Sequence, residues 1–249
     1  MLELLADKRA GAGLAELAVA ADAPKTSLVG LLAGLNEVGG VERDADGRYR
    51  LGPRFMALAL RATSGRDLLL LARPVLQDLA EESGETAVLG TLAPDAEMAT
   101  YLDRVESRNP IRYAVTIGER RELYCTAIGK VLLAHFSRTR REAYLAQTPL
   151  EAFTANTRTD AAVLRQELAA IRAEGLVRTC DERIPGASAV AAPVFGGDGT
   201  LVAAIMLAGP SQRIADRQKS LEALVRAAAL DCSTRLGAPD PAAPKDEPA

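Results

Sequence analysis

The stretch that decides the fold reads GLAELAVAADAPKTSLVGLLAGLNEVGGVERDADGRYRLGPR and occupies residues 13–54. It predicts one helix over Leu14–Ala20 and a second that begins after Pro24, because proline is favoured at the start of a helix. Apolar residues in the second helix recur three and four positions apart, which is the spacing of one buried helical face. These residues are Leu28, Leu31, Leu32, Leu35 and Val38. The pattern stops at Gly39-Gly40, where we expect the helix to end.

A hairpin is predicted directly after this helix. Two short extended runs, Val41–Arg43 and Arg48–Leu51, flank the turn Asp44–Gly47, and an Asp-Gly turn between short strands is a strong hairpin signal. A short helix over Met1–Lys8 precedes these elements. Helix, turn, helix and a basic hairpin in this order are typical of a winged helix-turn-helix.

The rest of the chain alternates between strand and helix patterns. Strands are predicted at Thr86–Leu92, Met98–Glu106, Ile111–Val115, Leu176–Cys180, Ala189–Phe195 and Leu201–Ala208. Helices are predicted from Leu68 to Gly84, at Ala127–Phe136, near Arg140, after the capping pair Thr159-Asp160, and from about Asp216 onward. Short strands mixed with helices in this order favour an α+β fold.

These patterns divide the chain into four parts. We expect a winged helix-turn-helix domain over 1–52, a helical connector over 53–66, an α/β domain over 67–237 and a disordered tail over 238–249. The connector has an apolar face formed by Phe55, Leu58 and Ala62, which would suit contact between subunits.

Composition limits the class of protein. Of 249 residues, 48% are hydrophobic and 25% are charged, and a net charge of −3 means that any site for nucleic acid must be local. No apolar run reaches the ~18 residues that a membrane span needs, and no secretory signal is recognised at the N-terminus. Three dispersed cysteines suit a reducing cytosol, so we expect a cytoplasmic protein without disulfides or structural zinc.

The sequence contains no recognisable catalytic or cofactor motif. It has no nucleophile elbow, Walker loop or dinucleotide fingerprint. The single histidine, His135, makes Ser-His or Cys-His catalysis improbable. Lys130 is interpreted as a helix-surface residue and Asp181-Glu182 as part of a solvated loop. We therefore expect no catalytic residue, no metal and no cofactor.

The N-terminal stretch resembles the helix-turn-helix and wing of the IclR family of bacterial regulators. Two later segments, LYCTAIGKVLLAHF at 123–136 and AVAAPVFGGDGTLVAAIMLAGPSQR at 189–213, are similar to the family's effector domain. The resemblance covers nearly the whole chain. It implies a GAF-like effector-binding domain, a homodimer or a dimer of dimers, binding to double-stranded operator DNA, and control of a catabolic operon.

Candidate DNA contacts lie first on the helix after Pro24. Lys25, Thr26 and Ser27 stand at its N-terminus, where short polar side chains suit the major groove and the helix dipole favours a phosphate. One departure from the family is Val29-Gly30, which replaces a pair that is often large and polar or basic. The reading of bases is therefore expected to be weaker, or shifted towards the hairpin.

The hairpin supplies the second set of candidate DNA contacts. Arg43, Arg48 and Arg50 would reach the DNA backbone or the minor groove. Residues 1–64 hold eight basic and eight acidic residues, whereas residues 43–73 hold seven arginines and three aspartates. The positive field thus lies on the hairpin and connector. The alternative is a winged helix used for protein contact.

Candidate effector contacts begin where Leu123–Gly129 leads into a helix, since free amides at its N-terminus could donate hydrogen bonds to a carboxylate. That segment includes Cys125 and Thr126. The resemblance places six further residues beside the effector, namely Tyr113, Ala127, Ile128, Ala189, Met206 and Ala208. Some family members have small polar residues where this chain has Ala189, Met206 and Ala208. The more apolar pocket favours an aromatic or otherwise bulky organic acid, to which Tyr113 could donate a hydrogen bond. The alternative is that the alanine-rich strands form only a tight core.

The main hypothesis is a transcriptional regulator, not an enzyme, whose operator binding responds to a small organic acid. A second hypothesis is a ligand sensor that has lost specific DNA binding, suggested by Val29-Gly30 and the neutral N-terminal charge. A third is an enzyme that processes a small acid, which would need a polar catalytic cluster that the sequence does not supply.

Overall fold

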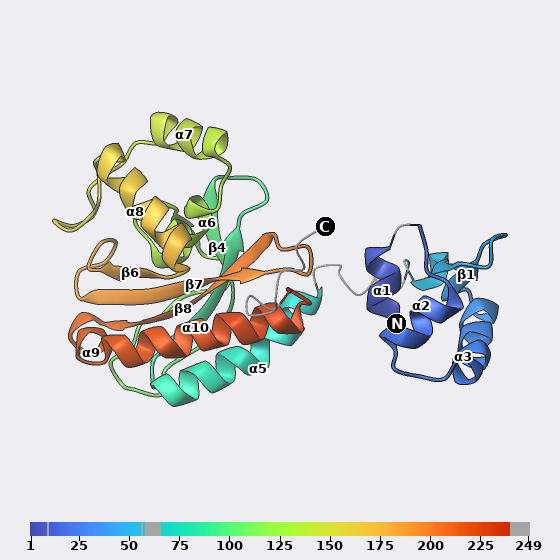
Figure 1. The fold of residues 1–249 in the computed structure, drawn as a ribbon. Coiled ribbons are helices and arrows are strands. Elements are labelled where there is room, and N and C mark those ends of the chain that lie inside the picture. The colour runs from blue at the N-terminus through green and yellow to red at the C-terminus, as the bar shows by residue number, and fades with distance from the viewer. Residues whose placement is uncertain (9, 56, 58–65, 240–249) are drawn as a thin grey trace. The chain divides into compact units, whose positions relative to one another are not determined.

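The computed structural model describes residues 1–8, 10–55, 57 and 66–239 (Figure 1). The chain forms two compact units, Met1–Asp67 and Leu68–Ala249. Two predictions fall on residues outside the described part: the connector face at Leu58 and Ala62, and most of the tail beyond 238.

The described residues of the N-terminal unit form helices and a two-stranded antiparallel hairpin. These are α1 (Leu2–Asp7), α2 (Leu14–Ala20), α3 (Lys25–Glu37), β1 (Val41–Arg43) and β2 (Tyr49–Leu51). Their core is formed by Leu5, Ala12, Leu17, Leu28, Leu32, Val41 and Tyr49. The predicted winged helix-turn-helix is therefore present, and Gly47 adopts the positive φ of +78° that the hairpin turn requires.

The apolar face of α3 is narrower than predicted. Leu28 and Leu32 are buried and Leu35 is partly buried, but Leu31 and Val38 are 52% and 49% exposed. At 3.6 residues per turn, Leu31 lies about 60° round the helix from Leu28, and Val38 follows the last residue of α3. The prediction that they point into the core was wrong, because the small domain buries only one line of leucines.

The second unit is built on a six-stranded antiparallel sheet with the strand order β5-β4-β3-β8-β7-β6. The strands are β3 (Thr86–Leu92), β4 (Met98–Val105), β5 (Arg120–Glu122), β6 (Val177–Cys180), β7 (Ala187–Phe195) and β8 (Leu201–Pro210). The helices are α5 (Arg66–Ser83), α6 (Ala127–Ala134), α7 (Arg138–Gln147), α8 (Ala161–Glu174), α9 (Ser211–Asp216) and α10 (Gln218–Arg235). This arrangement confirms the predicted α+β class.

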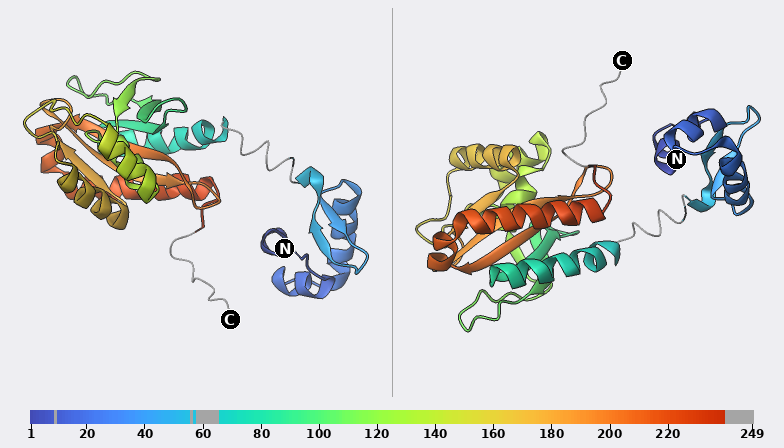
Figure 2. Two further views of the ribbon diagram at one scale, coloured as in Figure 1. Left: turned by 90° about the horizontal axis from the view of Figure 1, so that it is seen from above. Right: turned by 60° about the horizontal axis from the view of Figure 1, so that its bottom comes forward.

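Helices cover both faces of this sheet (Figures 1 and 2). Helices α5 and α10 lie side by side on one face, and α6 and α8 lie on the other. Alternate residues of β7 point to opposite faces of the sheet. Ala189 and Ala191 belong to the hydrophobic core on the face covered by α6, whereas Val190 and Ala192 belong to the core on the face covered by α10. Successive side chains of a strand point to opposite faces, so a strand that is buried on both faces is apolar throughout.

The strand predicted at Ile111–Val115 is absent, and the edge strand is β5 instead. Carbonyls of this segment accept hydrogen bonds from side chains, since Thr86 donates to the Tyr113 carbonyl (2.7 Å) and Arg213 donates to the Ile111 carbonyl (3.1 Å). The segment follows Pro110, which has no amide hydrogen to give to a ladder. Its β-forming composition was therefore misleading.

Candidate functional site

The N-terminal turn of α3 presents short polar side chains to solvent. Lys25, Thr26 and Ser27 are all exposed there. Further along, Val29 is 50% exposed, and no atom lies within 4 Å of the position that a side chain on Gly30 would take. The outer surface of α3 consequently carries few polar side chains beyond its first turn, where Lys25, Thr26 and Ser27 lie.

The three hairpin arginines have different surroundings. Arg48 donates to the Gly11 carbonyl (2.9 Å) and contacts Glu16 (3.3 Å), so it ties the hairpin to the start of α2. Arg43 and Arg50 are exposed, and Arg50 makes only a surface ion pair with Asp44 (3.3 Å). Exposed ion pairs contribute little to stability and are easily exchanged. Arg43 and Arg50 are therefore better placed than Arg48 to bind another anion.

A cavity of about 30 Å³ lies between the sheet and the N-terminus of α6. Seven of the eight predicted effector residues line it: Tyr113, Cys125, Thr126, Ala127, Ala189, Met206 and Ala208. The eighth, Ile128, is buried and packs against Gly90, and it is not part of the lining. The remaining lining residues are Tyr101, Thr179, Glu182, Arg183, Ile184, Ala187 and Ser188.

The floor of the cavity is a row of small residues across three strands. Thr179 of β6 pairs with Ala189 of β7, which pairs with Ala208 of β8. Their short side chains leave the space that larger residues would fill. The volume suffices for about two water molecules, since one water needs roughly 15 Å³ by this measure.

Helix α6 closes the opposite side of the cavity. Thr126 caps the helix, because its hydroxyl accepts a hydrogen bond from the Gly129 amide (3.3 Å) and donates to the Glu122 carbonyl (2.6 Å). A side chain at Gly129 would collide with the backbone of Glu122 and Leu123. Glycine at this position therefore lets the helix start directly against the end of β5.

Two tyrosines and one cysteine are among the uncharged polar groups of the cavity. Burial raises the pKa of both the Tyr101 and the Tyr113 hydroxyl. Burial also raises the pKa of the Cys125 thiol to about 12. The surroundings of Cys125 thus favour the neutral thiol over the thiolate.

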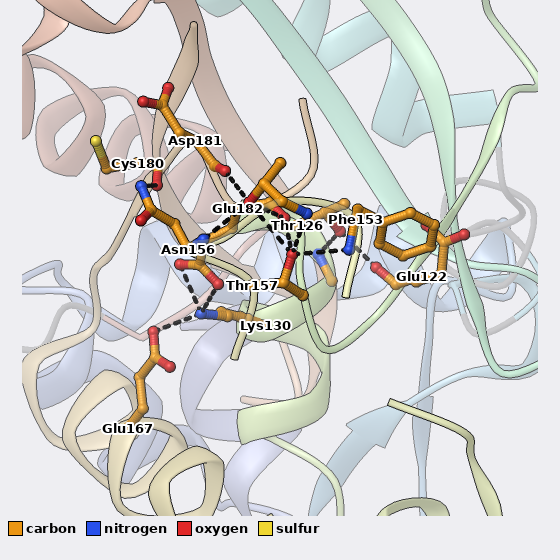
Figure 3. A network of polar contacts seen from close by, with 12 residues as sticks. Glu122, Thr126, Lys130, Phe153, Asn156, Thr157, Glu167, Cys180, Asp181 and Glu182 are labelled. Carbon is orange, nitrogen blue, oxygen red and sulfur yellow. Dashed lines mark hydrogen bonds and ion pairs between the residues drawn. The ribbon is translucent and has the colours of Figure 1, made fainter. Parts of the chain in front are cut away.

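A buried ion network lies behind the cavity (Figure 3). The Lys130 side chain is fully buried, and its Nζ atom donates to Glu182 Oε1 (2.9 Å) and Oε2 (2.7 Å) and to Glu167 Oε1 (2.6 Å). The interpretation of Lys130 as a surface residue and of Glu182 as solvated was wrong. Every residue of α6 is buried, and a helix that is buried all round carries its charged residue into the core.

The loop after β6 is fixed at several points. Its first carbonyls, at Asp181 and Glu182, accept hydrogen bonds from the hydroxyls of Thr154 (2.5 Å) and Thr157 (2.6 Å). Arg183 donates to Glu122 Oε2 (2.9 Å), and its guanidinium lies 3.8 Å from the ring centre of Phe153. Nothing in the sequence around Arg183 indicates its role, because its partners come from segments that are distant along the chain.

The described residues contain no cluster of side chains that could hold a metal ion. His135 makes a hydrogen bond with the Val131 carbonyl (2.9 Å) and packs edge-on against Phe195. Within the same part of the chain, no helix is both long and apolar enough to cross a membrane.

Comparison with known proteins gives a consistent result over almost the whole chain. The IclR helix-turn-helix domain matches residues 1–45, and the family described as bacterial transcriptional regulator IclR C-terminal matches residues 60–234. The chain is 32% identical to the HTH-type transcriptional regulator KipR of Bacillus subtilis, over 90% of this chain and 89% of that protein.

Two solved structures are also similar. The Agobacterium tumefaciens repressor BlcR is 26% identical, with a TM-score of 0.80 over 96% of this chain and 95% of that one. An IclR homologue from Microbacterium hydrocarbonoxydans, solved with 4-hydroxybenzoate bound, is 25% identical, with a TM-score of 0.64 over 90% of this chain and 91% of that one.

Proposed function

Because the chain belongs to the IclR family of bacterial transcriptional regulators, we propose that it binds operator DNA and that a small organic acid in the α6 cavity controls this binding. The observation that carries the proposal is the pairing of two features. One is a winged helix-turn-helix with an exposed polar helix end, and the other is a separate sheet domain with a cavity at a helix N-terminus.

The DNA contacts that we propose are Lys25, Thr26 and Ser27 on α3 and the arginines of the hairpin. Exposed hydroxyls at the start of α3 suit base edges and phosphates. Arg43 and Arg50 suit the DNA backbone, whereas Arg48 is partly occupied by Gly11 and Glu16.

The effector that we propose is an aromatic or otherwise bulky acid, and the complex of an IclR homologue with 4-hydroxybenzoate supports this class. The backbone amides of Ala127 and Ile128 at the start of α6 would donate hydrogen bonds to its carboxylate. A ring is larger than the present 30 Å³, so binding requires lining side chains to move. Met206 is an unbranched, many-rotamer residue that can do so.

The remaining features of the proposal follow from the family. We propose a homodimer or a dimer of dimers, because two-fold proteins read palindromic half-sites. We also propose a cytoplasmic location and no catalytic turnover, with no cofactor.

A shift assay with the promoter region beside the protein's own gene tests the DNA-binding part. Arg50→Ala should weaken binding and flatten its dependence on salt, because one phosphate contact is lost. The matched control is Arg165→Ala, which removes an arginine of similar exposure from the other domain and should change neither. Equal behaviour of the two variants would show that the hairpin does not touch DNA.

A specific observation favours one alternative, a sensor that no longer reads DNA. The outer face of α3 offers Val29 and Gly30 where hydrogen-bonding side chains would be expected. If the unmodified protein binds neither this promoter region nor a random duplex at low salt, the sensor function replaces the regulator function.

A further inference from the structure

We propose that Arg183 is the residue that selects acids over neutral molecules in the cavity, and that Glu122 holds its guanidinium where the carboxylate of the effector will bind. This inference rests on the proposed effector function and adds a charged partner to the amides of α6. It also explains why the loop after β6 is fixed so firmly.

Among the described residues that line the cavity, only Glu182 and Arg183 carry a charge, and only Arg183 is cationic. Its side chain is 26% exposed. The neighbouring groups in the lining are neutral: the tyrosine hydroxyls, the Cys125 thiol, and the hydroxyls of Thr126, Thr179 and Ser188. An entering anion would therefore find one cation, and that cation sits at the edge of the cavity.

The contacts of Arg183 leave it ready to exchange partners. Its Nε and a terminal nitrogen donate to the two carboxylate oxygens of Glu122 (2.9 and 3.4 Å). Glu122 is 28% exposed, so it can return to water when another carboxylate replaces it. Phe153 stacks on the guanidinium at 3.8 Å and keeps its plane fixed during the exchange.

Glu182 would repel an acid if its carboxylate were free, but it is paired with Lys130, which also pairs with Glu167. Both Glu182 oxygens accept hydrogen bonds from the buried Lys130 ammonium (2.9 and 2.7 Å). The ammonium of α6 holds this carboxylate together with that of Glu167 on α8 (Figure 3). Two adjacent loop residues of opposite charge thus have separate partners, and Arg183 remains the group that an acid meets.

Calorimetric titration of the full chain with acids and their amides tests this assignment. The probes are benzoate, 4-hydroxybenzoate, pyruvate and succinate, each compared with the corresponding amide. The unmodified protein should bind at least one acid and prefer it to its amide by about 10- to 100-fold, which is the range for a charge-assisted pair. Arg183→Gln should lose that preference, and Glu122→Gln should bind the acid up to about fivefold more tightly.

Two further variants guard against misfolding and general charge effects. Arg183→Lys keeps the charge and should keep most of the preference for the acid. Arg178→Gln removes an exposed arginine of β6 that pairs with Glu174 and Glu222 outside the cavity lining, and it should bind like the unmodified protein.

The possible outcomes separate this inference from the proposed function. If an acid binds and Arg183→Gln still prefers it to the amide, the role of Arg183 is refuted while the effector function stands. If no acid binds the unmodified protein, the acid-effector function is refuted and the inference with it.

Discussion

The substitution Lys130→Met tests the buried ion network behind the cavity. It replaces a fully buried ammonium by an apolar side chain of similar length. Glu182, which is 7% exposed, then loses its cation and keeps a buried carboxylate. Glu167 is 25% exposed and can turn to water, so the main loss of stability comes from Glu182.

The expected loss of stability is large. Removing one partner of a buried ion pair lowers the free energy of unfolding by about 3–5 kcal/mol, because the remaining charge is uncompensated. For a domain of this size, that corresponds to a fall of about 6–20 °C in the melting temperature. The double variant Lys130→Met, Glu182→Gln removes both charges and should recover most of the loss, since neutral replacement of a buried pair is often tolerated.

The loss in Lys130→Met should also depend on pH. Burial already raises the pKa of Glu182 in the folded protein, and loss of the ammonium raises it further. Because the pKa of the Glu182 carboxyl is higher in the folded than in the unfolded protein, the protonated carboxyl favours folding at pH values below the unfolded pKa of ~4.3. This contribution to the free energy of unfolding is lost as the pH rises through the folded pKa. The loss of stability in Lys130→Met should therefore be smallest near pH 4 and should increase towards pH 8.

Thermal and urea unfolding of the full chain between pH 4 and pH 8 provide the measurement. Lys219→Met is the control, since Lys219 is an exposed residue of α10, and it should unfold like the unmodified protein. A loss under 1 kcal/mol at pH 7.5 in Lys130→Met, or a loss that shrinks as the pH rises, would refute the reasoning.

Two glycine substitutions should change stability in opposite directions, and replacement of Ala189 should separate acid binding from DNA binding. Gly209→Ala places a methyl group against the Glu85 carboxylate, which is buried and paired with Arg213, so urea unfolding should show a loss of about 1–3 kcal/mol. Gly34→Ala lies in open space on α3 and should instead stabilise its domain by about 0.5–1 kcal/mol, and a loss there would contradict the exposed position. Ala189→Trp fills the cavity floor, so anisotropy with labelled promoter DNA should show binding that no longer responds to acid; a surviving response would place the effector elsewhere.

Much of the fold could be predicted because burial imposes a period on the sequence. The pattern predicted β3 at Thr86–Leu92 to the residue, since this strand lies in the middle of the sheet and every position there is constrained. The segment Ile111–Val115 has the same kind of residues, but the side chains of Thr86 and Arg213 occupy its carbonyls. Such long-range competition for a carbonyl leaves no trace in local composition.

The predicted part of the site came from two sources, the resemblance to the family and the place of Cys125 and Thr126 at a helix N-terminus. The resemblance implied five of the fourteen lining residues, including Ala189 and Ala208, which lie opposite each other on neighbouring strands. Lys130 was misinterpreted because lysine is usually exposed, although the apolar residues all round its helix pointed to burial. Arg183 gave no signal, because Glu122 lies 61 residues away and its contact exists only after folding.

The central claim is that acid binding in the α6 cavity and DNA binding by the winged helix are coupled. The most direct test measures DNA affinity with and without a saturating acid probe, and acid affinity with and without promoter DNA. We expect both affinities to change by the same factor, typically about 5- to 150-fold, because coupling between two sites is reciprocal. An acid that binds tightly in the cavity and leaves DNA affinity unchanged would contradict it.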